Sequence, residues 1–439
     1  MIVRRCSIAW LLVLVVLTLG CGLWSGPIRV NAATTPVVSV TTDRATVSFP
    51  DGIDFRLKAS AGAPVERVEL LYATVGNPTL TLLSPPHQTG TTINVSYRLD
   101  LRRHYLPPGV DVEYRWRFVG ADGDATETAP KRILWLDTRF DWVTYRSTDV
   151  ELHAYNKNDD FNDIVLDSAQ RTADRLKPVF GLNSLQPVRL WIYQSNDDFA
   201  ASQAPNSEPW VVGTAYVQLG LIVLVLPPGN PAEVRRTVPH EMTHQVLYQA
   251  TKNPFAGLPT WLDEGLAVYN QEISDPSFPG LVDAASDSGQ LDSIQSLTSS
   301  FPYDTESATL AYAESVSIVD YIVETFGRDA IPRLTRATKQ GLSYGDAVHI
   351  GLGISIDELD RRWTTWLADG GMESAAQTAG PNETISNGTA TGLASGAFVM
   401  TGAALLALVC AAITVARNRR SRHLEDDVPA MSSPTAGYL

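Results

Sequence analysis

The sequence predicts an α+β protein with two folded domains, which lie between two apolar segments near the ends of the chain. Three observations support this prediction. Short β-rich runs separated by turns fill residues 35–138, and strand patterns followed by helical patterns fill residues 139–370. Strands that come first and helices that come later are typical of the α+β class. An apolar stretch lies before the first domain and another lies after the second.

The composition is that of a folded protein with an acidic surface. Of the 439 residues, 44% are hydrophobic, and the formal net charge is −14. This length suits two domains. An acidic surface repels phosphate backbones, so we expect no nucleic-acid partner. The three cysteines, Cys6, Cys21 and Cys410, lie in the apolar end segments, so the folded middle has neither a disulfide nor a thiolate site.

The first apolar stretch predicts a secretory signal peptide over residues 1–32. Arg4 and Arg5 precede an apolar run from Ile8 to Trp24, and small residues follow it. This order is typical of export signals. The run is long, so an uncleaved signal anchor is the alternative.

The second apolar stretch, residues 393–416, predicts a transmembrane helix. It holds no charged residue, and at 1.5 Å per residue it spans the ~30 Å hydrocarbon core of a bilayer. Arginines follow this stretch directly. Basic residues next to a membrane span stay on the cytoplasmic side, which predicts a cytoplasmic tail over residues 417–439. The Gly-, Ala-, Ser- and Thr-rich residues 371–392 predict a flexible stalk. We therefore expect a single-pass protein of the cell membrane with both domains extracytoplasmic; a buried core helix is the alternative.

Residues 35–138 predict an immunoglobulin-like β-sandwich. In Val112–Phe118 apolar residues alternate with charged ones, as in a half-buried strand. Several such runs at short spacing suggest a sandwich, although the Cys…Trp…Cys pattern is absent. His87 and His104 are isolated and indicate no site. This domain would position the second one or bind a protein partner.

The chemistry of the second domain is indicated by one short motif. Asn230 and Pro231 favour the start of a helix, and Pro239 predicts a kink or a restart within it. His240 and His244 are four residues apart, so their imidazoles share one helix face and can bind one metal ion. Glu241 lies about 100° around the helix, where it can reach a water molecule at that metal.

A zinc site of this kind needs a third protein ligand. Leu247 and Ala250 stand where an astacin- or matrixin-like pattern needs Gly and His. A second helix offers another ligand: Thr260 and Asp263 predict a capping box at its start, which puts Glu264 in the first turn or just past it. A short loop between the two helices can bring Glu264 against both histidines.

These residues resemble the gluzincins, which include thermolysin and the aminopeptidase N group. His240-Glu241-x-x-His244 is followed twenty residues later by Glu264, within Trp261–Ala267, and the arrangement is similar to that of bacterial peptidase MA-like metallohydrolases. The resemblance covers roughly residues 139–370 and implies a gluzincin-type α+β metallopeptidase domain that acts on a peptide or protein substrate.

The resemblance also implies the roles of these residues. His240, His244 and Glu264 would bind one Zn2+, and Glu241 would be the catalytic base. Two departures limit it: Asp263 stands where aminopeptidases usually carry Asn, and no Gly-Ala-Met-Glu-Asn-type motif is present. Aminopeptidase activity is therefore not implied.

Other candidates depend on weaker patterns. Tyr312 lies where related enzymes carry a tyrosine that polarises the scissile carbonyl; packing on a helix is the alternative, and Tyr269 and Tyr303 compete for the role. His349 is interpreted as a core or surface residue. The stretch Gly213–Leu226 predicts either an edge strand that pairs with substrate or an ordinary internal strand.

The sequence thus favours a membrane-anchored, extracytoplasmic zinc metallopeptidase. Two alternatives stay open. One is a cell-surface scaffold or binding protein with a structural zinc ion, and the other is a zinc hydrolase that acts on something other than peptides.

Overall fold

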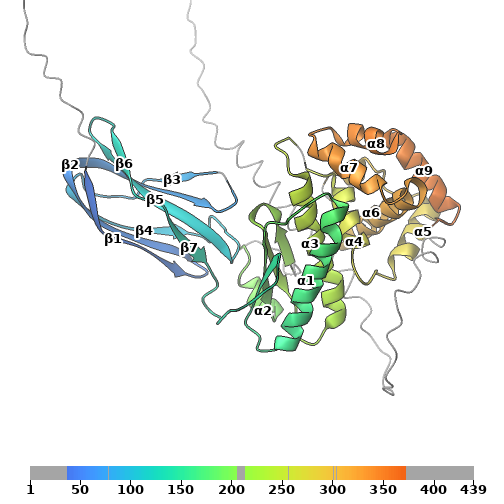
Figure 1. The fold of residues 1–439 in the computed structure, drawn as a ribbon, viewed down its shortest axis with the longest axis horizontal. Helices are drawn as coiled ribbons and strands as arrows, with labels where there is room; N and C mark the ends of the chain where they lie inside the picture. Colours follow the sequence, from blue (N-terminus) through green and yellow to red (C-terminus); the bar gives the residue numbers. More distant parts are fainter. Residues whose placement is uncertain are drawn as a thin grey trace, which may run out of the picture.

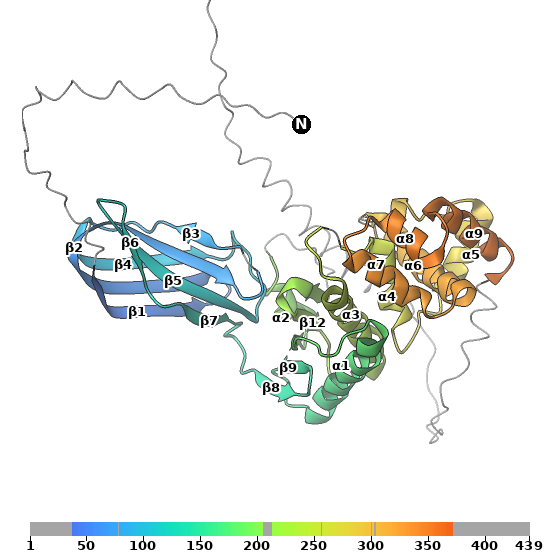
Figure 2. The ribbon, with the colours of Figure 1, turned by 45° about the horizontal axis from the view of Figure 1, so that its top comes forward.

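The computed structural model describes residues 37–371, apart from residues 78, 205–212, 256, 300 and 303. The described chain is elongated and follows the sequence order along its long axis (Figures 1 and 2). A β-rich region lies at one end, a five-stranded sheet with two long helices lies in the middle, and a group of helices forms the other end. The protein is therefore of mixed α+β type, as predicted.

The β-rich region is one hydrogen-bonded network of seven strands. The strands are β1 (Val38–Ser48), β2 (Gly52–Thr74), β3 (Thr81–Leu83), β4 (Gly90–Asp100), β5 (Val110–Gly120), β6 (Ala125–Glu127) and β7 (Lys131–Trp135). The 23-residue strand β2 holds the network together. Its first half pairs with β1 and β4, and its second half pairs with β3 and β5, with irregular pairing around Val65.

The core of this region lies between the two halves of β2. Phe55 in the first half packs edge-on against Tyr114 at 4.9 Å and Trp116 at 6.4 Å, which belong to the strand paired with the second half. The prediction of an immunoglobulin-like sandwich is wrong in topology, because one long strand is shared by both layers where two separate sheets were expected. Neither His87 nor His104 belongs to a metal-binding group among the described residues.

The middle of the molecule is a sheet of five strands. They are β8 (Val143–Arg146), β9 (Val150–Ala154), β10 (Val188–Tyr193), β11 (Gly213–Tyr216) and β12 (Leu221–Val225), in the order β11-β12-β10-β9-β8. The three central strands are parallel, and both edge strands are antiparallel to their neighbours. The stretch predicted as Gly213–Leu226 therefore holds an edge strand, β11, and an internal strand, β12.

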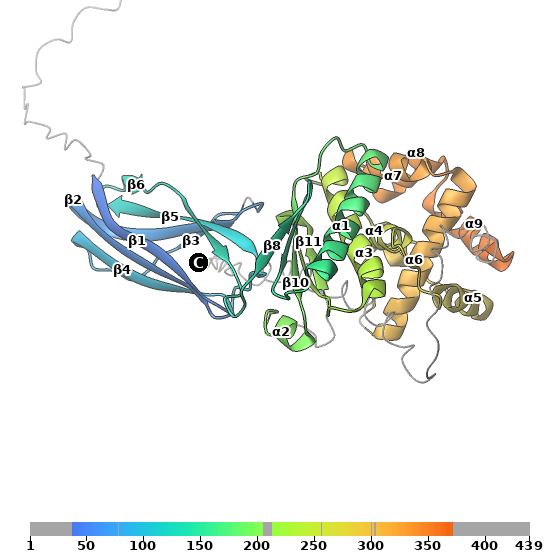
Figure 3. The ribbon, with the colours of Figure 1, turned by 60° about the horizontal axis from the view of Figure 1, so that its bottom comes forward.

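Two long helices, α1 (Asp159–Val179) and α3 (Pro231–Thr251), cover one face of this sheet (Figure 3). Leu190, Ile222 and Leu224 of the sheet share a buried cluster with Val165 of α1 and Met242 of α3. All five side chains are fully buried. The burial of this apolar surface fixes α3 against the sheet.

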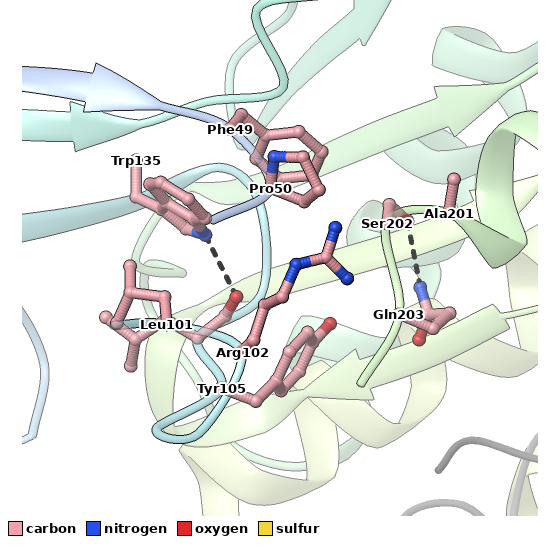
Figure 4. Close-up of a pocket in the computed structure, with 10 residues that line it drawn as sticks. Phe49, Pro50, Leu101, Arg102, Tyr105, Trp135, Ala201, Ser202 and Gln203 are labelled. Carbon is pink, nitrogen blue, oxygen red and sulfur yellow. Dashed lines mark hydrogen bonds between the residues drawn. The ribbon is translucent and has the colours of Figure 1, made fainter. Parts of the chain in front are cut away.

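The β-rich region packs against the same five-stranded sheet, on the face opposite α1 and α3, through polar and aromatic contacts. Arg189 of β10 lies 2.9 Å from Asp111 of β5, and the hydroxyls of Tyr105 and Tyr216 are 3.3 Å apart. Beside this junction the loops of the β-rich region and Ala201–Gln203 enclose a cavity of ≈20 Å3 (Figure 4). This volume holds about one water molecule.

The remaining helices form the other end of the molecule. They are α4 (Thr260–Tyr269), α5 (Phe278–Ser288), α6 (Thr305–Phe326), α7 (Ala330–Lys339), α8 (Tyr344–Leu352) and α9 (Ile356–Ala368), with a 3-10 turn at Ser296–Thr298. Their apolar faces enclose a second core that includes Trp261, Tyr312 and Trp363. The short helix α2 (Asn196–Ala200) and a 3-10 turn at Val217–Leu219 lie beside the five-stranded sheet instead.

The predicted fold class needs a second correction, which concerns the membrane. Within residues 37–371, leaving aside the gaps named above, no helix is long and apolar enough to cross a bilayer. The transmembrane helix expected at 393–416 lies outside the described residues, as do the predicted signal peptide at 1–32, the tail at 417–439 and, beyond its first residue, the stalk predicted at 371–392. The fold that the structure describes is thus α+β without a membrane span.

Candidate metal centre

Helix α3 carries the two histidines of the motif and is continuous from Pro231 to Thr251. The Asn230 side chain accepts a hydrogen bond from Glu233 N at 3.2 Å, so the predicted N-terminus is confirmed. The expected restart at Pro239 does not occur. Proline lacks an N–H, so the carbonyl oxygen of Arg235, four residues earlier, loses its helical donor. That oxygen accepts instead from Glu272 N at 3.0 Å, which lies after α4.

The side chains of His240, His244 and Glu264 converge on one point. The two Nε2 atoms are 3.2 Å apart. Glu264 Oε2 lies 3.6 Å from Nε2 of His240 and 3.4 Å from Nε2 of His244. One potential ligand atom from each residue lies within 4.8 Å of the others. The structure thus brings together the three residues that the spacing predicted.

Glu264 reaches this point from the first turns of α4, but the predicted capping box is absent. The residue at the cap position is Pro259, Thr260 is the first helical residue, and no side chain caps the helix. The carboxylate of Asp263 points elsewhere and lies 3.2 Å from His244 Nδ1. The tertiary contact with the imidazole therefore replaces the local capping contact.

A close approach of two helix backbones sets the position of α4. A Cβ on Gly265 would lie 2.4 Å from the carbonyl oxygen of Ser315 in α6 and 2.9 Å from Val319 Cγ2. Only glycine fits here, because the obstructing oxygen belongs to the backbone. Because Gly265 directly follows Glu264, this contact fixes the position of α4 next to the third candidate metal ligand.

Glu241 is buried beside the three converging residues. It is 1% exposed, and neither carboxylate oxygen has a hydrogen-bond partner among the described residues. Burial raises the pKa of this carboxyl to about 7; His244 opposes the shift, and Glu264 adds to it. A buried carboxylate without a partner is costly, so its position next to the converging side chains indicates a functional role.

The charges of the converging residues suit a cation. Burial lowers the pKa of His240, which favours the neutral imidazole that binds metals. Burial by itself raises the pKa of Glu264, but the nearby imidazoles of His244 and His240 outweigh it and hold this pKa well below its ordinary value. Glu264 is therefore an anion at neutral pH.

The residues present fit a metal ion. Two imidazoles and one carboxylate are a donor set that zinc uses in catalytic sites. Each imidazole also has a polar partner at its second nitrogen: Asp263 at His244 Nδ1, and the amide of Gln271 at 3.2 Å from His240 Nδ1. Such partners orient metal-binding histidines. Sequence reasoning missed Gln271, because this residue lies outside any described helix and 31 residues from its partner.

Of the other candidates, two tyrosines and one histidine lie in the described part of the chain. Tyr312 is 1% exposed and packs edge-on against Phe301, with ring centroids 5.1 Å apart. Tyr269 ends α4, and burial raises the pKa of its hydroxyl. Tyr303 lies outside the described residues, and His349 is exposed on α8. His349 is therefore a surface residue, as one of the two interpretations expected.

Comparison with known proteins agrees with this geometry. A family model described as the Peptidase MA superfamily matches residues 168–369, from within α1 to the end of the described helices. The match supports a gluzincin-like peptidase at the coarse level and suggests a metallopeptidase, without a closer assignment to the thermolysin or aminopeptidase N type. No curated protein matches the chain significantly.

Proposed function

We propose that this protein is a zinc-dependent metallopeptidase that hydrolyses peptide bonds with Glu241 as general base. The observation that carries the proposal is the convergence of His240, His244 and Glu264 beside the carboxylate of Glu241, which has no hydrogen-bond partner among the described residues. The match to a peptidase superfamily over the same residues supports it.

In this proposal His240, His244 and Glu264 hold the zinc ion. When bound, zinc supplies a Lewis acid that polarises a carbonyl oxygen and makes water more acidic. Glu241 has two buried oxygens that bind no described group, so its carboxylate accepts the proton of the attacking water. The same carboxyl then donates that proton to the leaving amine.

The edge strand β11 is the proposed binding surface for an extended substrate. Among the described strands of its sheet β11 is the outermost, and β12 is the one described strand that pairs with it. Ala215 of β11 belongs to the buried cluster that also contains residues of α3. A free strand edge next to the helix with the histidines can pair with a peptide backbone.

Two further roles belong to the proposal. Tyr312 stabilises the oxyanion. Its position in the sequence, downstream of the His240–His244 motif, supports this role. The β-rich region positions the catalytic part or binds a protein partner; the ion pair between Asp111 and Arg189 supports the first of these. Residues 1–32 support a location outside the cytoplasm.

The rival function is a scaffold in which zinc serves structure only. A structural zinc site is closed by four protein ligands. In the described part of the chain the group that can hold a metal has three members, and an unpartnered carboxylate has no use in a closed site. These two observations favour the peptidase.

The proposal is tested by zinc analysis and peptide cleavage on the same purified protein. We expect one zinc ion per chain and cleavage of members of a broad peptide library that stops when zinc is chelated. Glu264→Ala should lose the zinc, whereas Glu306→Ala, at an exposed site on α6, should keep it. Cleavage that persists without any metal would refute the proposal.

A further inference from the structure

We propose that Gln271 is a positioning residue that holds the imidazole of His240 in the orientation and tautomer that bind the metal. The inference rests on the proposed zinc site and deepens it. It starts from one contact: the Gln271 amide nitrogen lies 3.2 Å from Nδ1 of His240.

The orientation of this amide matters. The Gln271 amide oxygen is buried and has no hydrogen-bond partner among the described residues. A rotation of the amide by 180° exchanges its oxygen and nitrogen with little change in shape. In the rotated state the oxygen faces Nδ1 of His240 and can accept a hydrogen bond from it.

Metal binding requires that rotated state. The Nε2 atom of His240 faces His244 and Glu264, so Nε2 is the nitrogen directed at the proposed metal. A neutral imidazole that binds a metal through Nε2 carries its proton on Nδ1 and needs an acceptor there. The amide oxygen of Gln271 is the acceptor that the structure places within reach.

The backbone around Gln271 is firmly held. All three backbone N–H groups of residues 270–272 donate: Asn270 to Leu266 O at 3.1 Å, Gln271 to Val268 O at 3.1 Å and Glu272 to Arg235 O at 3.0 Å. The last bond exists because Pro239 leaves the Arg235 carbonyl without its helical donor. The proline next to His240 therefore creates the acceptor that docks the segment carrying Gln271.

Arginines hold the side chains on both sides of Gln271. Arg175 of α1 donates to the side-chain oxygen of Asn270 at 2.5 Å and to its carbonyl oxygen at 2.9 Å. Glu272 accepts from Arg171 of α1 at 3.2 Å and from Arg235 of α3 at 3.1 Å. The two ion pairs at Glu272 are exposed and stabilise weakly. The hydrogen bonds from Arg175 to the buried Asn270 therefore contribute most to holding this segment in place.

The two imidazoles thus have chemically different partners. A carboxylate such as that of Asp263 beside His244 can only accept a hydrogen bond, whereas the Gln271 amide beside His240 can accept or donate. An amide accommodates either tautomer of His240. A carboxylate at position 271 would favour only the tautomer that binds the metal, so it should replace Gln271 without loss of zinc affinity.

The test compares three variants by zinc affinity, measured in competition with a chromophoric chelator. Gln271→Leu removes the acceptor at similar volume and should weaken zinc binding 10–100-fold, the usual cost of losing such a partner. Gln271→Glu should bind zinc as tightly as the wild type or more tightly. Gln249→Leu is the matched control: Gln249 is also half-buried and bonds to the backbone of Gln186 away from the site.

Two further readouts distinguish positioning from folding. The melting temperature of the metal-free protein should be nearly equal for Gln271→Leu and Gln249→Leu. In the zinc-loaded wild type, 15N NMR should show the His240 proton on Nδ1. Wild-type zinc affinity in Gln271→Leu, or equal losses in Gln271→Leu and Gln271→Glu, would overturn the inference while the proposed function stands. A wild-type protein that binds no zinc would overturn both.

Discussion

The carboxylate of Asp263 lies 3.2 Å from Nδ1 of His244, one residue before the proposed ligand Glu264. A single turn of α4 therefore provides both a metal-binding carboxylate and a group that orients one of the histidines. This explains why Asp263 does not cap its own helix.

Asp263→Ala should lower zinc affinity by roughly 10–100-fold, because His244 loses the acceptor for its Nδ1 proton. Asp263→Asn keeps an acceptor oxygen and should lose less. The measurement is chelator competition, with the exposed Asp287→Ala as the control. Equal affinity in Asp263→Ala and the wild type would remove Asp263 from the metal site.

Gly265→Ala should destabilise the protein by roughly 1–3 kcal/mol, the usual cost of overpacking. The added methyl group would meet the Ser315 carbonyl, which cannot move without shifting α6. Zinc affinity should fall as well, since α4 carries Glu264. Gly280→Ala is the control, because a Cβ there meets nothing within 4 Å. Denaturant unfolding of the metal-free proteins measures the difference, and equal stability of the two variants would contradict the close approach.

Glu314 should make the stability of the metal-free protein depend on pH. Burial raises the pKa of this α6 carboxyl to about 8 from an ordinary 4.5. Between these values the unfolded chain has released the proton and the folded chain retains it, so stability falls as pH rises from about 4.5 to about 8. Each unit of pKa difference corresponds to about 1.4 kcal/mol.

The variant Glu314→Gln removes this titration. It keeps an oxygen that can accept from Asp292 N at 2.9 Å, and its amide nitrogen replaces an oxygen that has no described partner. Its melting temperature should exceed that of the wild type by several degrees at pH 8 and differ little at pH 5. The exposed Glu306→Gln should show no such trend. A difference that is the same at both pH values would show that Glu314 titrates normally.

Tyr312→Phe should lower kcat by roughly 10²-fold with zinc retained, the usual loss when one oxyanion donor is removed. Phenylalanine preserves the edge-on contact with Phe301, so the fold should persist. Steady-state kinetics on a peptide found by library screening measure the effect. A near-normal kcat would make Tyr312 a packing residue and direct attention to Tyr269 or Tyr303.

Helical periodicity explains how much of the candidate site could be predicted from the sequence. Two histidines four apart must share a helix face, and a glutamate early in the next helix can reach them. Both relations depend on local spacing, and the structure brings His240, His244 and Glu264 together.

Contacts between distant segments could not be predicted in this way. Gln271 reaches His240 because Glu272 docks on the Arg235 carbonyl, and no local pattern encodes that bond. Asp263 has the spacing of a capping residue, but His244 competes for it. The sharing of β2 between two layers likewise depends on which strands pair with each half.

The most direct test of the central claim is the variant Glu241→Gln. Glutamine has nearly the same size but cannot accept a proton at neutral pH. If Glu241 is the base and not a ligand, zinc content and melting temperature should stay close to the wild-type values, and peptide cleavage should fall by ~10²–10⁴-fold. Wild-type cleavage by Glu241→Gln would contradict the mechanism, and loss of its zinc would make Glu241 a ligand of a structural site.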